Sequence, residues 1–156
     1  MEYQILIVED DRKIYEMLQD ELGSDYELIR VRSVDEAIGE YKYRKEAELP
    51  FHCFIIDLAI IAIGLTEEEM VKYENREGFA LLKKIWEKYP NDEEYIRERT
   101  IICSRYILDF QTEYSEDELK KLSLIIKKRR SEEDVKKEVN KIINKLNNEK
   151  VKKNNK

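Results

Sequence analysis

The sequence predicts a single α/β domain in which helices cover both faces of a parallel sheet. Apolar runs such as ILIV, at residues 5–8, and FHCFII, at residues 51–56, are apolar at nearly every position. Strands of this kind are typical of parallel sheets buried on both faces. Such runs alternate five times with segments whose apolar residues recur at helical spacing, which indicates a doubly wound fold. With 156 residues, 42% of them hydrophobic, the chain is large enough for one core.

The first half of the chain predicts three strands and two helices. After the strand at residues 5–8, apolar residues at helical spacing predict a helix that ends at Gly23. The second strand is YELIRV, at residues 26–31. Ser33 and Glu36 form a capping-box pattern that begins the second helix, and the third strand is the run at residues 51–56.

The second half continues the alternation. A helix opens at Gly78 and stops before Pro90, and TIICS and LSLII then supply the fourth and fifth strands. Ser131 caps the last helix. We expect the domain to span residues 1–147 and residues 148–156 to form a frayed tail rich in Lys and Asn.

Two stretches fit the pattern less well. Residues 61–77 form a long insertion after the third strand, in which Thr66 and Glu69 form a second capping box for a short extra helix. Between residues 106 and 121 the helical signal is weak, and Ser115 with Glu118 predicts only a short fourth helix.

Composition narrows the class of protein. The net charge is −6, which argues against a general nucleic-acid binder. The longest apolar run, residues 51–65, contains His52 and Asp57 and is too short to span a bilayer. With no signal peptide in the sequence, we expect a cytoplasmic protein without membrane contact. Cys53 and Cys103 lie in apolar runs, so we expect structural thiols and no disulfide.

Polar residues stand where the predicted strands end. Glu9 and Asp10 follow the first strand, Asp57 the third, and Ser104 ends the fourth, with two lysines after the fifth. Ligands of doubly wound sheets bind beyond this edge. Converging carboxylates repel one another unless a cation neutralises them, and Mg²⁺ is suited to hard oxygen ligands. A carboxylate at such a site can also act as the nucleophile that accepts a phosphoryl group.

The motifs ILIVEDD, FIIDL, IICS and IIKKRRSEEDV resemble those of response-regulator receiver domains, over residues 3–146. The resemblance implies a flavodoxin-like (βα)5 fold with strand order 2-1-3-4-5, and a phosphoacceptor signalling domain rather than an enzyme. It implies that Asp57 accepts the phosphoryl group and that Ser104 is the switch hydroxyl. It also implies that Mg²⁺ is bound by Glu9, Asp10, Asp57 and the carbonyl of Ala59.

The resemblance also implies partners. A sensor histidine kinase or phosphotransfer protein of a bacterial two-component system would supply the phosphoryl group, and a downstream effector protein would receive the signal. We expect a stand-alone receiver with no DNA-binding output domain.

Two lysines compete for the position of the family's invariant lysine. The family places an apolar helix residue seven positions after that lysine, and Val135 stands seven positions after Lys128, whereas Asp134 follows Lys127 by the same spacing. This spacing favours Lys128.

The sequence departs from the family pattern at four positions. Arg129 stands where a proline with a cis peptide bond is usual, so we expect a trans bond there. Arg105 replaces a small residue and either shields the aspartate or binds phosphate. Ile125 replaces the switch aromatic, and Ile61 replaces a proline.

Other classes of protein compete with a phosphorylatable receiver. A phosphorylation-independent pseudo-receiver acting as a binding module is the main one, and some other metal-dependent hydrolase is a lesser one. A haloacid-dehalogenase-like phosphatase needs a second aspartate where Ala59 stands. A flavodoxin-like cofactor site or a nucleotide-binding loop needs a phosphate loop, and EDDRK has the opposite charge.

Overall fold

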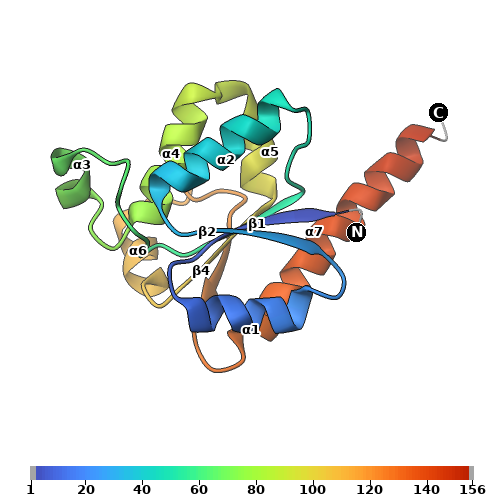
Figure 1. Ribbon diagram of the computed structural model, residues 1–156, viewed down its shortest axis with the longest axis horizontal. Helices are drawn as coiled ribbons and strands as arrows, with labels where there is room; N and C mark the ends of the chain where they lie inside the picture. The colour runs from blue at the N-terminus through green and yellow to red at the C-terminus, as the bar shows by residue number, and fades with distance from the viewer. Residues whose placement is uncertain (1–2, 155–156) are drawn as a thin grey trace.

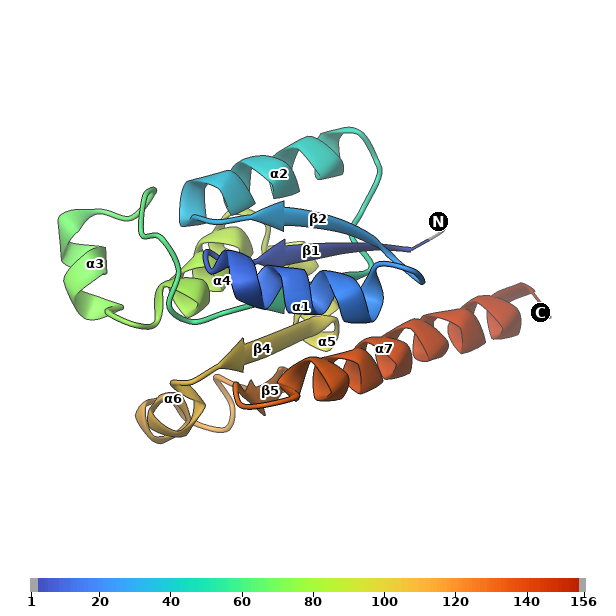
Figure 2. The same ribbon diagram turned by 60° about the horizontal axis from the view of Figure 1, so that its bottom comes forward.

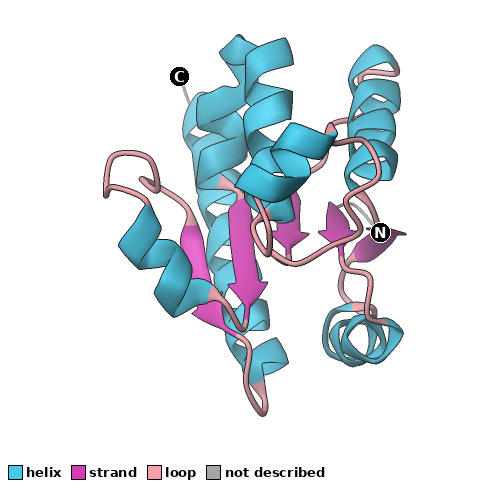
Figure 3. Ribbon diagram, turned by 90° about the vertical axis from the view of Figure 1, so that its left-hand side faces the viewer, coloured by secondary structure: helices cyan, strands magenta, loops and turns pink. Residues whose placement is uncertain are grey.

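The computed structural model describes residues 3–154 and contains one five-stranded parallel sheet. The strand order is β2-β1-β3-β4-β5, as the resemblance implies. In Figure 1 the sheet lies between two layers of helices, and Figure 3 shows helices on both sides of the strands. The strands are β1 (Gln4–Val8), β2 (Glu27–Val31), β3 (Cys53–Ile56), β4 (Thr100–Ser104) and β5 (Ser123–Ile126).

Helices α1 and α7 cover one face of the sheet, where they lie side by side (Figure 2), and the other helices gather on the opposite side. Each face has its own apolar cluster. The smaller cluster joins β1, β3 and β4 to α1 and α7, and the larger one packs the opposite face against α2, α4, α5 and α6. The helices are α1 (Arg12–Leu22), α2 (Val34–Glu46), α3 (Glu67–Lys72), α4 (Glu77–Lys88), η1 (Pro90–Asp92), α5 (Glu93–Glu98), α6 (Ile107–Glu113) and α7 (Ser131–Asn154).

The predicted helix starts are confirmed at two capping sites. The Ser33 hydroxyl accepts a hydrogen bond from the N–H of Glu36, which begins α2. Thr66 and Glu69 form the reciprocal capping box of the short extra helix α3. Both starts were readable from sequence because a capping box depends only on neighbours three residues apart.

The region between β4 and β5 differs from the prediction. Helix α6 begins at Ile107, upstream of Ser115, because Ile107 and Phe110 are buried in the larger cluster. Ser115 and Glu118 do bond to each other, but within a turn rather than at the start of a helix. Here tertiary burial, not local capping, decides where the helix forms.

Two further observations concern the end of the chain and the segment after Pro90. Helix α7 continues to Asn154, so residues 148–154 of the expected frayed tail are helical, and residues 155–156 lie outside the described residues. The sequence analysis names no element between Pro90 and the fourth strand, where η1 and α5 lie, and Ile96 of α5 is fully buried. Both cysteines are free and buried, as predicted. Within residues 3–154, no helix is long and apolar enough to cross a bilayer.

The insertion at residues 61–77 is held against the start of α2. The N–H groups of Val34 and Asp35 donate to the carbonyls of Ile61 and Ile63, at 3.1 and 2.8 Å. These amides belong to the first turn of α2, which has no acceptor inside its own helix. Gly64 adopts a φ of 109°, and a Cβ there would lie 2.9 Å from Asp35. The insertion is therefore an ordered part of the domain.

Helix α4 begins directly against the end of β3. A Cβ added to Gly78 would lie 2.1 Å from the backbone oxygen of Asp57, closer than real atoms approach, and the Gly78 N–H donates to the Leu58 carbonyl at 2.8 Å. Only glycine allows this contact. The position of Asp57 therefore depends on the residue at 78.

We expect Gly78→Ala to lower the free energy of unfolding by about 1–3 kcal/mol, because the new methyl group forces α4 away from β3. Gly39, in the middle of α2, is the matched control, since a Cβ there meets nothing within 4 Å. Gly39→Ala should raise stability by about 0.5–1 kcal/mol, because alanine loses less backbone entropy in a helix. Denaturant unfolding of both variants measures the change in the free energy of unfolding. Equal changes in the two variants would contradict the close approach of Gly78 to the Asp57 backbone.

Candidate functional site

Three charged side chains lie together at the carboxyl end of the sheet. Ile7, Ile55 and Ile125 pack in or against the cluster beneath α1 and α7. Side chains alternate between the faces of a strand, so residues two positions further on lie on the same face. Those residues are Glu9, Asp57 and Lys127. Strand pairing brings Glu9 and Asp57 level, because Ile7 pairs with Ile55, and Lys127 follows Ile126, which pairs with Ser104 at the end of β4.

Lys127 bridges the two carboxylates. Its Nζ lies 2.7 Å from Oε1 of Glu9 and 2.5 Å from Oδ2 of Asp57. All three side chains are largely withdrawn from water, with 13%, 4% and 10% of the lysine, glutamate and aspartate side chains exposed. One positive charge therefore faces two buried carboxyl groups.

This imbalance changes the proton affinity of the groups. Burial, and next the charge of Asp57, raise the pKa of Glu9 from its ordinary value of 4.5 to about 7, although Lys127 opposes the change. For Lys127, burial alone favours the neutral amine, but the charge of Asp57 and the hydrogen bonds that Lys127 donates to both carboxylates outweigh it and raise the pKa. The site consequently lacks the positive charge that would balance both carboxylates at neutral pH.

Backbone groups hold the carboxylates in place. The N–H of Ala59 donates to Oδ1 of Asp57, and that of Asp11 to Oε2 of Glu9, both at 3.3 Å. Arg30 donates to the carbonyls of Glu9 and Asp10 at 3.0 and 3.2 Å. The turn after β1 is thus tied to β2, which fixes the direction of the glutamate.

The three acids after β1 have separate roles. Asp11 is the N-cap of α1, and its carboxylate accepts hydrogen bonds from the N–H groups of Lys13 and Ile14. Glu9 is buried beside Asp57, while Asp10 is exposed. A carboxylate at the first turn favours the helix through its free N–H groups and its dipole.

Ser104 lies at the end of β4 and is completely buried. Its hydroxyl accepts a hydrogen bond from the N–H of Tyr106 at 3.3 Å. Arg105, between them, is exposed. Among the described residues, neither Ser104 nor Arg105 forms a hydrogen bond or ion pair with Asp57.

The oxygen donors at this edge fit a divalent cation by their chemistry. Two carboxylates compete for one ammonium group, and the exposed carboxylate of Asp10 adjoins them. Nevertheless, residues 3–154 hold no group of three or more His, Cys, Asp or Glu side chains already gathered as a metal site.

The structure brings Lys127, and not the predicted Lys128, to the carboxylates. Lys127 makes both carboxylate contacts, whereas Lys128 is exposed. The chain then turns at Arg130, which has a left-handed conformation with φ of 65°, before α7 starts at Ser131. Strand alternation agrees with this placement, because Ile125, two positions before Lys127, packs against the cluster beneath α1 and α7.

The peptide bond before Arg129, another departure from the family pattern, has the conformation that the sequence analysis expects. The peptide bond between Lys128 and Arg129 is trans, as every peptide bond of the described residues is. Ile125 is partly buried against the α1–α7 cluster.

Arg76 is a structural residue that the sequence did not reveal. Its side chain is 6% exposed, and it forms a two-pronged ion pair with Glu113 of α6, with distances of 2.8 and 3.2 Å. It precedes α4 by one residue, close to the contact of Gly78 with Asp57. The pair thus joins the start of α4 to α6. No local motif predicts it, because the two partners are far apart in sequence.

Comparison with solved structures identifies the fold. A sensor protein from Polaromonas sp. JS666 matches with a TM-score of 0.65 and 18% identity, over 92% of this chain and 98% of that one. The response regulator TrrA from Thermotoga maritima, solved with Mg²⁺ and BeF, has a TM-score of 0.59 and 19% identity, over 90% and 98% of the two chains. A CheY-like receiver domain from Methanospirillum hungatei JF-1 has a TM-score of 0.58 and 18% identity, over 92% and 98%.

This chain therefore has the fold of response-regulator receiver domains, which confirms the predicted resemblance at the level of the fold. Searches of the sequence against protein-family models and against curated proteins found no match.

We expect Lys127→Met to lower the free energy of unfolding at pH 7.5 by about 2–4 kcal/mol, because two buried carboxyl groups lose their common cation. Lys128→Met is the matched control and should change it by no more than about 0.5 kcal/mol. Denaturant unfolding in a buffer with EDTA measures both. Equal losses, or a larger loss for Lys128→Met, would show that Lys127 does not neutralise the site.

A second prediction concerns pH. Since the pKa of Glu9 lies at about 7 in the folded protein and near 4.5 when unfolded, ionising Glu9 costs folding stability as pH rises through this window. Glutamine at this position cannot ionise. In EDTA, the free energy of unfolding of Glu9→Gln should therefore rise by about 1–3 kcal/mol relative to that of the wild type between pH 4.5 and pH 8, as denaturant unfolding would measure. A stability difference between the two proteins that does not vary with pH would contradict the raised pKa of Glu9.

Proposed function

We propose that this protein is a receiver domain that accepts a phosphoryl group on Asp57 and transmits the change to a partner protein. The observation that carries the proposal is the convergence of Asp57, Glu9 and Lys127 at the carboxyl edge of a receiver-type sheet. A signalling domain fits this arrangement better than a metabolic enzyme, because the fold is that of receiver domains and Asp57 is a nucleophile with a stabilising charge beside it.

In the proposed reaction, an oxygen of the Asp57 carboxylate attacks the phosphorus of a phosphodonor. A new bond forms between this oxygen and phosphorus, and the bond from phosphorus to the donor breaks, with its electrons leaving on the donor. Lys127 is positioned to stabilise the negative charge first on the carboxylate and then on the phosphoryl oxygens. Ser104, at the end of the neighbouring strand, would donate its hydroxyl hydrogen to a phosphoryl oxygen.

Mg²⁺ is the cofactor that we propose for this step. Glu9, Asp10 and Asp57, with the carbonyl of Ala59, would hold it, and it would neutralise charge on the transferred group. The raised pKa of Glu9 supports a cation requirement, because a bound metal ion favours the ionised carboxylate. The Mg²⁺ in the TrrA structure belongs to that protein and supports the proposal only by fold similarity.

The proposed partners follow from the same chemistry. A histidine kinase or phosphotransfer protein would deliver the phosphoryl group, and an effector protein would read the change in surface. The Arg76–Glu113 ion pair offers a route to α6, since it begins beside the helix that touches the backbone of Asp57. We propose a cytoplasmic location for this exchange.

A pseudo-receiver that acts without phosphorylation is the second candidate. It is favoured by the existing bridge of Lys127 to both carboxylates and by the lack of a gathered metal site in the described chain. Ile125, in place of the switch aromatic, favours it as well.

Incubation with acetyl phosphate and Mg²⁺, followed by intact mass, tests the proposal. The wild type should gain the mass of one phosphoryl group, and Asp57→Asn should not. Lys127→Met should reduce the yield at least tenfold while Lys128→Met retains it, because only Lys127 contacts Asp57.

The outcomes separate the two candidates. An adduct that depends on Asp57 and on Mg²⁺ supports the phosphorylatable receiver. A wild-type protein that is folded by circular dichroism but stays unmodified with both acetyl phosphate and phosphoramidate would overturn the first proposal in favour of the pseudo-receiver.

A further inference from the structure

A cavity of about 320 Å³ lies at the opposite end of β3 from Asp57. It opens between the last turns of α2, the residues leading into β3, and η1 with α5. Its walls carry the rings of Tyr41, Phe51, Phe54 and Tyr95. Volume and aromatic lining are those of a site for a small organic molecule.

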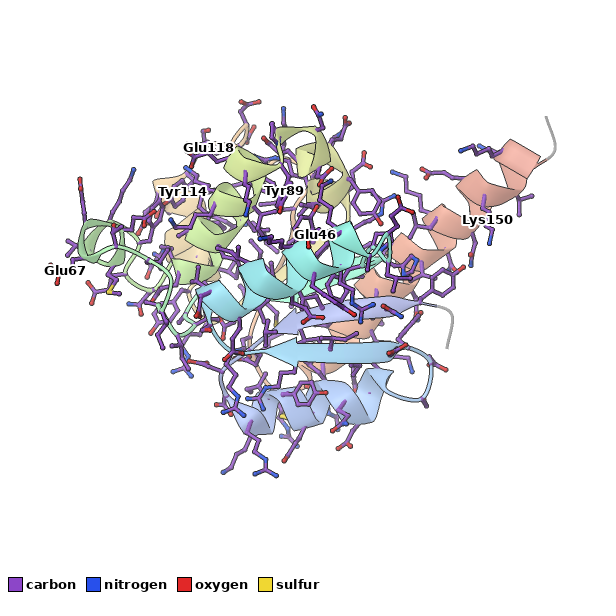
Figure 4. The ribbon with its side chains drawn as sticks, turned by 45° about the horizontal axis from the view of Figure 1, so that its top comes forward. Glu46, Glu67, Tyr89, Tyr114, Glu118 and Lys150 are labelled. Carbon is purple, nitrogen blue, oxygen red and sulfur yellow. The ribbon has the colours of Figure 1, made fainter. Side chains whose placement is uncertain are left out.

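Figure 4 labels two residues near this region, Glu46 in the last turn of α2 and Tyr89 after α4. The ring of Tyr89 lies 5.4 Å from that of Tyr41, and Lys45 lies over it at 5.1 Å. The end of α2 is thereby packed against the end of α4.

The aromatic walls are fixed by contacts among themselves. Ring centroids of Phe51 and Phe54 are 5.9 Å apart, and those of Tyr41 and Phe54 are 6.3 Å apart. The Tyr95 hydroxyl donates to the carbonyl of Phe51 at 2.8 Å. Phe51 and Phe54 are almost completely buried, so the floor of the cavity belongs to the larger core. Such a preformed surface requires little ordering when a ligand binds.

Three of the four charged side chains around the cavity already have partners, and the fourth, Glu48, is exposed. Nζ of Lys45 lies 2.7 Å from Oδ2 of Asp92, and the Tyr41 hydroxyl donates to the same oxygen at 2.7 Å. Arg44 pairs with Glu40 at 3.5 Å and lies over the ring of Phe51 at 4.9 Å. An anionic ligand would have to break one of these pairs. The cavity therefore favours an uncharged molecule over an anion.

One acceptor remains available. Both hydrogen bonds to the Asp92 carboxylate end on Oδ2, and none that the described residues make ends on Oδ1. This carboxylate is 22% exposed, so its second oxygen is within reach of a ligand. A ligand with a hydrogen-bond donor on its edge would donate to Oδ1 of Asp92.

We propose that this cavity binds a small uncharged aromatic molecule that carries one hydrogen-bond donor, with its ring among the four aromatic side chains and its donor on Asp92. Asp92 and Tyr95 come from η1 and α5, segments that the alternating pattern of strands and helices does not require. The site is independent of Asp57 and does not rest on the proposed phosphorylation.

Titration of the ¹⁵N-labelled protein with indole tests the site. We expect saturable shifts of the backbone amide signals of Tyr41, Asp92 and Tyr95, with the amides of α1 unchanged. Cyclohexanol, which has a donor but no aromatic ring, and benzoate, which is aromatic but anionic, should bind at least tenfold more weakly. The absence of saturable indole shifts at these amides would overturn the proposal, as would equal binding of cyclohexanol or tighter binding of benzoate.

Asp92→Leu removes the acceptor and should weaken indole binding at least tenfold. Asp20→Leu, at an exposed position of α1, is the matched control and should leave it unchanged. If Asp92→Leu loses the dispersed spectrum of a folded protein, Tyr95→Leu removes one ring wall instead and should weaken binding to a similar extent. Unchanged indole binding in the folded variant overturns the proposal.

Discussion

The burial of two carboxyl groups side by side is the constraint on which the rest of this structure depends. Glu9 and Asp57 lie at the ends of adjacent strands, and Lys127, at the end of the edge strand, bridges them. Charges removed from water are tolerated only when they are paired and hydrogen-bonded. The order of the strands and the length of β5 are therefore tied to the chemistry of this edge, since a shift of one residue in β5 would replace Lys127 by Lys128 or Ile126.

The surroundings of Asp57 are held by contacts that leave little room for movement. Gly78 lets the first turn of α4 touch the Asp57 backbone, and Arg76, just before that helix, pairs with Glu113 of α6. The insertion is fastened to the start of α2 through the carbonyls of Ile61 and Ile63. A structural change at Asp57 would consequently reach α4 and α6 first, and these are the helices through which the proposed signal would pass.

The sequence predicted the layered α/β fold, the order of elements and most helix starts, because these depend on patterns within a few residues. Apolar runs identified the five strands, and the capping boxes at Ser33 and Thr66 identified two helices. It failed between β4 and β5, where the local signal at Ser115 was weaker than the burial of Phe110, and after Pro90, where Ile96 anchors α5 in the core.

For the candidate site, the sequence by itself determined which strand ends carry acids, a hydroxyl and lysines, since those residues follow the apolar runs directly. Only the tertiary structure decided that Lys127 rather than Lys128 meets the carboxylates, and that Asp10 stays exposed while Glu9 is buried. The reason is physical. Which face a residue occupies depends on strand register and on the left-handed turn at Arg130, and both are fixed by packing between segments far apart in the chain.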